Sequence, residues 1–302
     1  MLSQAIDRYI ALRRVAGYQM TVQSGLLHNF ARYAAERSQT QVQRQTAIDW
    51  AATAPSPYQR ENRLSMVRGF AHHARAEDPR HDRVPRHVFA RQRRRSFPPI
   101  LSPEELRQLL EATARLRPRG SLRPHTYYTL FGLLATTGLR ISEAMHLLLS
   151  DVTTAGLMVR QTKFRKSRWV PLHPSTADAL ERYLERRQAY AHGDDHVFVS
   201  TEGRALSYAM INGTFRFLLR SVDLHMKPGL PQPRIHDLRH RFAVRALESC
   251  HARDDVARHI LALSTYLGHA HVADTYWTLQ ATPQLMRDIA DACEACREGA
   301  LS

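Results

Sequence analysis

The residues best suited to chemistry in this sequence lie in the stretch Arg234-Ile235-His236-Asp237-Leu238-Arg239-His240. Two prolines just before it keep the chain extended, so a helix is predicted to begin here. His236 and Arg239 are one helical turn apart and can face one ligand. An arginine fork beside an imidazole suits a phosphate. Two alternatives stay open: a helix N-terminus with a capping network, and a metal site on His236 and His240, although no HExxH glutamate accompanies them.

A second basic residue, Arg140, lies on a predicted tight turn between two helices. Gly138 can adopt the left-handed backbone conformation that such a turn needs, and Ser142 can cap the following helix. An arginine held there is either in a structural salt bridge with Glu143 or a fixed ligand for an anion. The helix before the turn, over residues 127–135, is predicted to be buried because almost all of its residues are apolar.

Lysine is rare in this chain, which has three lysines against forty arginines. A lysine can give up its proton near neutral pH if its pKa is lowered, whereas an arginine cannot, so a fixed lysine is a candidate general acid. Short strands are predicted at residues 157–159 and 168–172, and the turn between them carries Lys163, Arg165 and Lys166. Codon bias and the solvated charge usual at a hairpin tip are the alternative explanations.

The composition favours a soluble protein with a polyanionic partner. The net charge is +15 and the sequence pI is about 10.4; residues 1–101 hold 17 arginines, no lysine and seven acidic residues, which favours contact with phosphates. The sequence shows no long apolar run and no signal-peptide pattern, so a cytoplasmic protein is expected. Cys293 and Cys296 are interpreted as the buried face of a last helix, with zinc as the weaker alternative.

The chain is predicted to divide into two domains and a linker. Residues 1–84 read as four short helices with a basic exterior, which suits a DNA-binding module or a generic helical bundle. Residues 85–101 form an arginine-rich linker that is not expected to pack in a core. The second domain, residues 102–302, opens on a capping box. Further helices are expected at 175–190, 207–224 and from 256, with a short strand at 197–199.

Taken together, these residues resemble the tyrosine recombinase family, also called phage integrases. The family has an Arg in a TGLRxSE turn, a Lys in a β-hairpin, an HxxR pair, a later His in an LGH motif, and a Tyr nucleophile. The matching residues in this sequence are Arg140, Lys163, His236, Arg239 and His269, with Tyr276 as the nucleophile.

The resemblance implies a mainly α fold with a small antiparallel β-sheet, in which an N-terminal helical core-binding (SAM-like) domain precedes an α+β catalytic domain. It also implies site-specific recombination or transposition of a mobile element, through a covalent 3′-phosphotyrosine intermediate and without metal or cofactor. The partners expected are double-stranded DNA at a recombination site and further copies of the chain, as a tetramer on two duplexes held together by residues 284–298. The location expected is the bacterial cytoplasm, in association with the nucleoid. Residues expected to contact DNA are Arg91, Arg93, Arg94, Arg95, Arg165, Lys166 and Arg168.

The sequence departs from the family pattern at the nucleophile. The family tyrosine usually follows the LGH histidine by about nine residues, and that position is Thr278 here, whereas the nearby tyrosine is Tyr276. On a helix, two residues turn a side chain by roughly 200°. A catalytically silent DNA-binding partner of an active recombinase is therefore the alternative function, and a type IB topoisomerase-like enzyme is a third.

Overall fold

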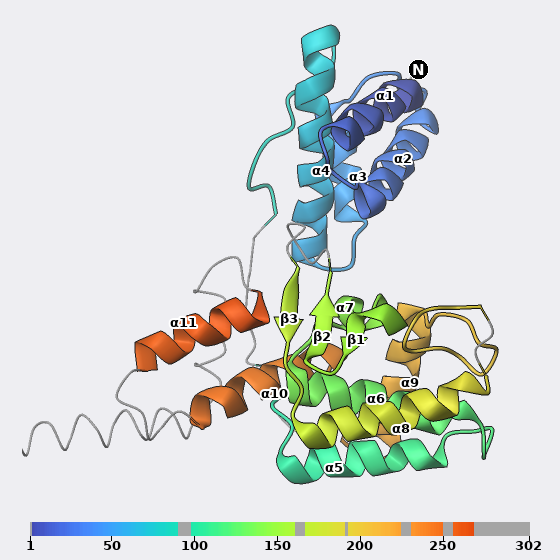
Figure 1. Cartoon of the computed structure of the whole chain (residues 1–302). Coiled ribbons are helices and arrows are strands. Elements are labelled where there is room, and N and C mark those ends of the chain that lie inside the picture. The colour runs from blue at the N-terminus through green and yellow to red at the C-terminus, as the bar shows by residue number, and fades with distance from the viewer. Residues whose placement is uncertain are drawn as a thin grey trace, which may run out of the picture. The chain divides into compact units, whose positions relative to one another are not determined.

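A computed structural model describes most of the chain (Figure 1). The chain divides into two compact units, Met1–Arg95 and Ser96–Ser302, and the boundary falls inside the predicted linker. Within the described ranges, no helix has the length and apolar character needed to cross a lipid bilayer. The described residues are 2–89, 98–160, 167–190, 193–224, 231–249 and 256–268.

The first unit contains the four predicted helices. They are α1 (Leu2–Val15), α2 (Thr21–Ala35), α3 (Arg44–Ala52) and α4 (Pro57–Glu77). Apolar residues at helical spacing bury the large rings of Phe30, Trp50 and Phe70 at the centre of this bundle. Helix α4 has Pro57 in its first turn and Ser56 as its N-cap. Its 21 residues make it longer than the short helix that was predicted.

The two ends of the predicted linker pack against the units that they adjoin. Val84 is buried in the core of the first unit, and Phe89 packs partly against that core. Arg68 on α4 donates a hydrogen bond to the Pro85 carbonyl at 2.8 Å. In the second unit, Leu101 is buried. The prediction that residues 85–101 stay out of a core is therefore wrong for the apolar Phe89 and Leu101, which pack against the cores of the first and second units.

The second unit is mainly helical and is built around α6 (Leu122–Thr137), which is buried along most of its length. Figure 1 shows α5 (Pro103–Ala112) and α8 (Pro174–Gln188) running alongside α6, with α10 (Ile235–Glu248) also against it. Helix α5 begins with the predicted capping box, since Ser102 and Glu105 each accept from the backbone N–H of the other. The other described α-helices of this unit are α7 (Ile141–Met145), α9 (Tyr208–Ser221) and α11 (Val256–Leu267).

A small antiparallel sheet in the order β1-β2-β3 completes the second unit. Strands β2 (Gly156–Val159) and β3 (Arg168–Val170) form the predicted hairpin, in which Leu157 pairs with Val170 and Val159 with Arg168. Strand β1 (Val152–Thr153) was not predicted, because two residues carry no periodic signal. The mainly α fold with a small antiparallel sheet is confirmed.

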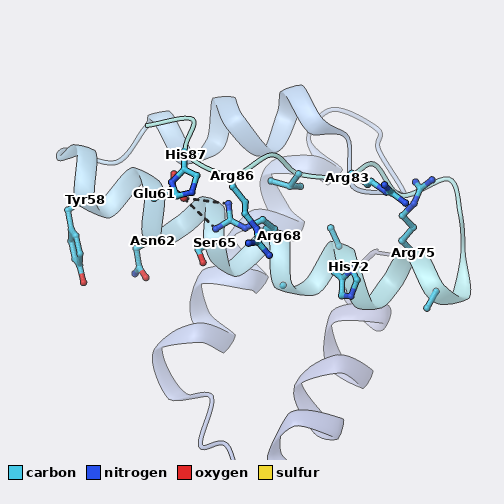
Figure 2. Close-up of a pocket in the computed structure, with 14 residues that line it drawn as sticks. Tyr58, Glu61, Asn62, Ser65, Arg68, His72, Arg75, Arg83, Arg86 and His87 are labelled. Carbon is cyan, nitrogen blue, oxygen red and sulfur yellow. Dashed lines mark hydrogen bonds and ion pairs between the residues drawn. The ribbon is translucent and has the colours of Figure 1, made fainter. Parts of the chain in front are cut away.

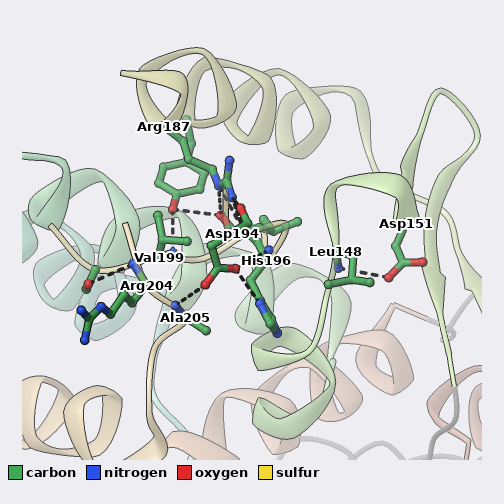
Figure 3. A network of polar contacts seen from close by, with 11 residues as sticks. Leu148, Asp151, Arg187, Asp194, His196, Val199, Arg204 and Ala205 are labelled. Carbon is green, nitrogen blue, oxygen red and sulfur yellow. Dashed lines mark hydrogen bonds and ion pairs between the residues drawn. The ribbon is translucent and has the colours of Figure 1, made fainter. Parts of the chain in front are cut away.

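The strand predicted at residues 197–199 is wrong. The segment forms only one isolated bridge, between Val199 and Ala205, next to a second bridge between His196 and Leu148. Side chains hold the segment instead (Figure 3). Buried Arg187 donates to the carbonyls of Asp194, His196 and Val197, and the Asp194 carboxylate accepts from the backbone N–H groups of His196 and Ala205. A three-residue apolar run is thus buried here without a neighbouring strand.

Candidate phosphate-binding site

The turn after α6 fixes the backbone of Arg140. Gly138 has a φ of 63°, which confirms the predicted left-handed turn. A Cβ at Gly138 would lie 2.4 Å from a ring carbon of Phe242 on α10, so only glycine lets the two helices approach this closely. The next helix, α7, is capped by the Glu143 carboxylate, which accepts from the Arg140 N–H at 2.9 Å. The predicted Ser142 cap is wrong, because α7 begins at Ile141, so Arg140 is its N-cap and Ser142 lies inside its first turn.

The Glu143 carboxylate is buried and accepts four hydrogen bonds. Two come from the backbone and side chain of Arg140, at 2.9 Å each. The other two come from the two terminal nitrogens of Arg168, at 3.0 and 2.9 Å. Burial acts to raise the pKa of Glu143, but the hydrogen bonds and charges of Arg168 and Arg140 outweigh it and hold this pKa below the ordinary value. The salt-bridge interpretation of Arg140 is confirmed.

Arg140 also reaches the end of α11. Its second terminal nitrogen donates to the Gly268 carbonyl at 2.9 Å, which lies immediately before His269. The Arg140 side chain keeps 22% of its surface exposed. The salt bridge therefore leaves part of the guanidinium open to an anion, so both interpretations made from the sequence are compatible.

Arg239, on α10, is 4% exposed. Its terminal nitrogens donate to the Gly138 and Leu267 carbonyls at 2.6 Å each. Burial, followed by the positive charge of Arg140, lowers the pKa of Arg239 to about 9. The side chain thus joins α10 to the ends of α6 and α11, and it lies within electrostatic reach of Arg140.

His236 lies at the start of α10, where the capping network considered from the sequence is also present. Asp237 is buried and accepts from the Arg234 N–H at 2.7 Å, whereas His236 keeps an exposed side chain. Desolvation of the imidazole by the surrounding protein is the largest cause that holds the pKa of His236 well below its ordinary value. The positive charges of His240, Arg239 and Arg140 lower this pKa further. The imidazole is therefore neutral near pH 7, and an anion bound beside it would raise this pKa and favour acceptance of a proton.

The metal alternative concerns His236 and His240. The two rings meet edge to face, with centroids 4.7 Å apart. Among the residues that the structure describes, no group of three His, Cys, Asp or Glu side chains could hold a metal ion.

Positive charge exceeds negative charge around this site. Within the described part of the chain, the guanidinium groups of Arg140, Arg168 and Arg239 interact with one carboxylate, that of Glu143. Each cation raises the electrostatic free energy of the others, and a bound anion would offset that repulsion. The arrangement is therefore suited to a phosphodiester whose negative charge grows during a reaction.

Several predicted site residues lie outside the described residues. They are Arg91, Arg93, Arg94, Arg95, Lys163, Arg165, Lys166, His269, Tyr276, Thr278, Cys293, Cys296 and residues 284–298. The structure thus brings Arg140, His236 and Arg239 together, and the placement of the other catalytic residues stays a prediction.

Sequence reasoning grouped Arg168 with the DNA contacts and missed its pairing with Glu143. Both terminal nitrogens of Arg168 bond Glu143, and its side chain is 15% exposed. In the structure Val170 is buried and Trp169 is exposed, so Arg168 shares the inward face of the strand with Val170. The sequence carries no clear signal of this, because Trp169 on the opposite face is also apolar. Tyr266 was also overlooked; its ring stacks on Phe242 with centroids 5.5 Å apart, and burial raises the pKa of its hydroxyl despite the charges of Arg168 and Arg239.

The first unit has a separate basic cleft of about 1140 Å³ between α4 and residues 83–87 (Figure 2). Uncharged residues from one stripe of α4 (Asn62, Ser65 and Gly69) and the acidic Glu61 contribute to its lining. The basic side chains that line it are Arg68, His72, Arg75, Arg83, Arg86 and His87. The cleft therefore combines hydrogen-bonding groups with a rim of positive charge, which suits a nucleic-acid backbone and bases.

The family model of the phage integrase family matches residues 99–281. The chain belongs to the phage integrase family. The y4rB protein of Sinorhizobium fredii (strain NBRC 101917 / NGR234) is assigned by inference as an integrase/recombinase. It is 38% identical to this chain over 296 residues, which cover 94% of each chain. The tyrosine recombinase XerD of Halalkalibacterium halodurans is 31% identical over 207 residues, covering 67% of this chain and 64% of XerD.

Solved structures agree on the fold of this integrase-family chain. The XerH recombinase bound to a palindromic difH substrate, in a post-cleavage complex, has a TM-score of 0.66 at 19% identity and covers 89% of this chain and 78% of its own. A lambda integrase dimer (residues 75–356) bound to a COC′ core site has a TM-score of 0.65 at 17% identity, with coverages of 93% and 96%.

Proposed function

We propose that this chain is a site-specific DNA recombinase of a mobile element, which cuts and rejoins strands through a covalent 3′-phosphotyrosine intermediate without metal. The observation that carries the proposal is the juxtaposition of Arg140 and Arg239 around a site with excess positive charge. Membership of the phage integrase family supports DNA as the source of the phosphate.

Each site residue has a role that its chemistry suits. Arg140 and Arg239 stabilise the negative charge that builds on the nonbridging oxygens when a nucleophile attacks the phosphorus. His236, held neutral, accepts or shares the proton of the nucleophile. The Tyr276 oxygen forms a bond to the 3′ phosphate as the bond to the 5′ oxygen breaks. Lys163 then protonates that leaving oxygen, and His269 donates a hydrogen bond to the phosphate.

The remaining charge serves to hold duplex DNA. The α4 cleft is a candidate surface of the first unit for both phosphates and base edges. The linker arginines Arg91, Arg93, Arg94 and Arg95, together with Arg165 and Lys166 of the hairpin, are further candidates for phosphate contact. A tetramer on two duplexes, assembled through residues 284–298, is the proposed active form.

A second candidate function is a catalytically silent DNA-binding partner. The observation that favours it is Thr278 at the position where the family usually has its tyrosine. A threonine hydroxyl is a much weaker acid than a phenol, so Thr278 is a poor substitute nucleophile.

Trapping of a covalent adduct distinguishes the two functions. The full chain is incubated with nicked duplexes taken from the DNA that flanks its gene, and adducts are counted on denaturing gels for wild type, Tyr276→Phe and the control Tyr128→Phe, at an exposed tyrosine of α6. A recombinase gives an adduct that only Tyr276→Phe removes. DNA binding without any adduct favours the silent partner, and an adduct that survives Tyr276→Phe refutes the proposed nucleophile. Relaxation of supercoiled plasmids that lack the flanking DNA would point to a topoisomerase-like enzyme.

A further inference from the structure

Arg168 differs from the other two arginines of the site in its contacts. Its two terminal nitrogens form a two-pronged pair with Glu143, and its third nitrogen, Nε, is buried without a hydrogen-bond partner among the described residues. Both terminal nitrogens of Arg168 are therefore directed at Glu143, and its side chain is only 15% exposed. These contacts point to a role of Arg168 that is exerted on Glu143.

Glu143 in turn determines where Arg140 lies. One carboxylate oxygen accepts from the Arg140 side chain and the other from the Arg140 backbone N–H. The same two oxygens each accept one bond from Arg168. Because a bidentate arginine fixes the plane of a carboxylate, Arg168 sets the plane from which Glu143 holds both parts of Arg140.

We infer that Arg168 is a positioning residue of the phosphate site, which orients the Glu143 carboxylate and through it the Arg140 guanidinium. The inference rests on the proposed function, because it assigns Arg168 to the same strand-cleavage reaction. It also gives β3 a role beyond the hairpin, since Arg168 is the first residue of that strand and joins the sheet to the turn after α6.

The charges that face Glu143 give this role a pH signature. They are Arg140 from the turn before α7, Arg168 from β3 and Arg239 from α10. In the intact protein the pKa of Glu143 is lowered, so the carboxylate is charged throughout the neutral range. Without Arg168 the effect of burial gains weight and this pKa rises. Protonation of Glu143 as the pH falls would then release Arg140, and a rise in pH would restore it.

The test compares Arg168→Gln with wild type in the full chain. The matched control is Arg160→Gln, at the exposed residue that follows β2, which forms an ion pair with buried Asp151. A first measurement is ¹³C NMR of glutamate carboxylates, in which the Glu143 signal is recognised by its loss in Glu143→Gln. We expect its titration midpoint to move to higher pH in Arg168→Gln, to lie in between in Arg168→Lys, and to stay unchanged in Arg160→Gln. An unchanged midpoint in Arg168→Gln would overturn the inference.

A second measurement follows cleavage of the flanking-DNA duplexes between pH 6.5 and 8.5. We expect Arg168→Gln to lose about tenfold in rate at pH 6.5 and less than about threefold at pH 8.5, with DNA affinity within about twofold of wild type. A loss that does not vary with pH, or a loss of affinity in its place, would contradict a positioning role. The NMR titration needs no DNA, so it shows whether Arg168 controls the pKa of Glu143 even if the wild-type protein proves unable to cleave.

Discussion

Arg187 and Arg239 are two buried arginines of the second unit that bind backbone carbonyls in place of a carboxylate. Arg187 is 3% exposed and Arg239 is 4% exposed. Arg187 holds the carbonyls of Asp194, His196 and Val197, which lie within ten residues of it in sequence. Arg239 holds the carbonyls of Gly138 and Leu267, which are 101 and 28 residues away in sequence and lie at the ends of two other helices.

The difference lies in the neighbours of the two guanidinium groups. Arg187 lies beside Tyr183 and a polypeptide segment that it holds in place. Arg239 lies beside Arg140 and Arg168, whose positive charges disfavour its own. A structural cation is normally not surrounded by others, because the repulsion lowers stability. The comparison therefore teaches that Arg187 contributes to the fold, whereas Arg239 is kept in an electrostatically unfavourable position that a bound phosphate would relieve.

The largest expected effect is the loss of cleavage in Arg239→Gln. Removing a preorganised donor from a developing oxyanion reduces the rate by about 10²–10³-fold. Single-turnover adduct formation on the nicked flanking-DNA duplexes measures this rate. DNA affinity should change by less than about fivefold, because the phosphate is one contact among many. Equal losses of rate and affinity would show that Arg239 binds the ground state only.

Arg187→Met gives the opposite pattern. It leaves buried carbonyls without donors, so we expect the free energy of unfolding to fall by about 2–3 kcal/mol. Urea denaturation measures the fall, and cleavage per folded molecule should stay within about twofold of wild type. If Arg187→Met abolished cleavage without loss of stability, the distinction between the two arginines would fail.

Gly138→Ala tests whether the Arg140 turn depends on close packing with α10. The residue has a φ of 63°, and the added methyl would lie 2.4 Å from the Phe242 ring. We expect a loss of about 1–2 kcal/mol from the backbone conformation alone, with more from the displaced ring. The matched control is Gly132→Ala, where a Cβ meets no atom within 4 Å and helix propensity favours alanine by about 1 kcal/mol. Equal stability of the two variants would contradict the packing.

The smallest effect concerns the basic cleft of the first unit. Arg86→Gln should weaken DNA binding only a few-fold, for all sequences alike, and reduce the slope of log affinity against log salt by about one. Fluorescence anisotropy at several salt concentrations measures the slope. The control is Arg107→Gln, whose guanidinium is paired with Glu104 and Glu111 in the second unit. An unchanged slope in Arg86→Gln would remove this cleft from the DNA-binding surface.

Local signals in the sequence predicted much of the frame of the site. The glycine of the Arg140 turn, the capping box at Ser102 and the β2–β3 hairpin are confirmed, because each depends on neighbours within a few residues. The same reasoning failed at Ser142, where a competing carboxylate was three residues from the N-cap, and at residues 197–199, where a buried arginine replaces a partner strand.

The contacts between distant segments could not be predicted. Nothing near Arg239 in sequence identifies the carbonyls of Gly138 and Leu267 as its acceptors, and nothing near Glu143 identifies Arg168 as its partner. These pairings depend on how α6, α10, α11 and β3 pack together. The sequence therefore indicated candidate residues for the chemistry, and the packing of these elements decides which of the described candidates lie together.

A double-mutant cycle on Arg140 and Arg239 tests most directly whether both serve one phosphorus. Adduct formation is measured for wild type, Arg140→Gln, Arg239→Gln and the double variant, at matched occupancy of the nicked duplex. If both guanidinium groups stabilise one transition state, the double variant should react about as slowly as the slower single variant, because groups that act as a unit are not additive. Losses that multiply would contradict the account, since they would mean that the two arginines act independently.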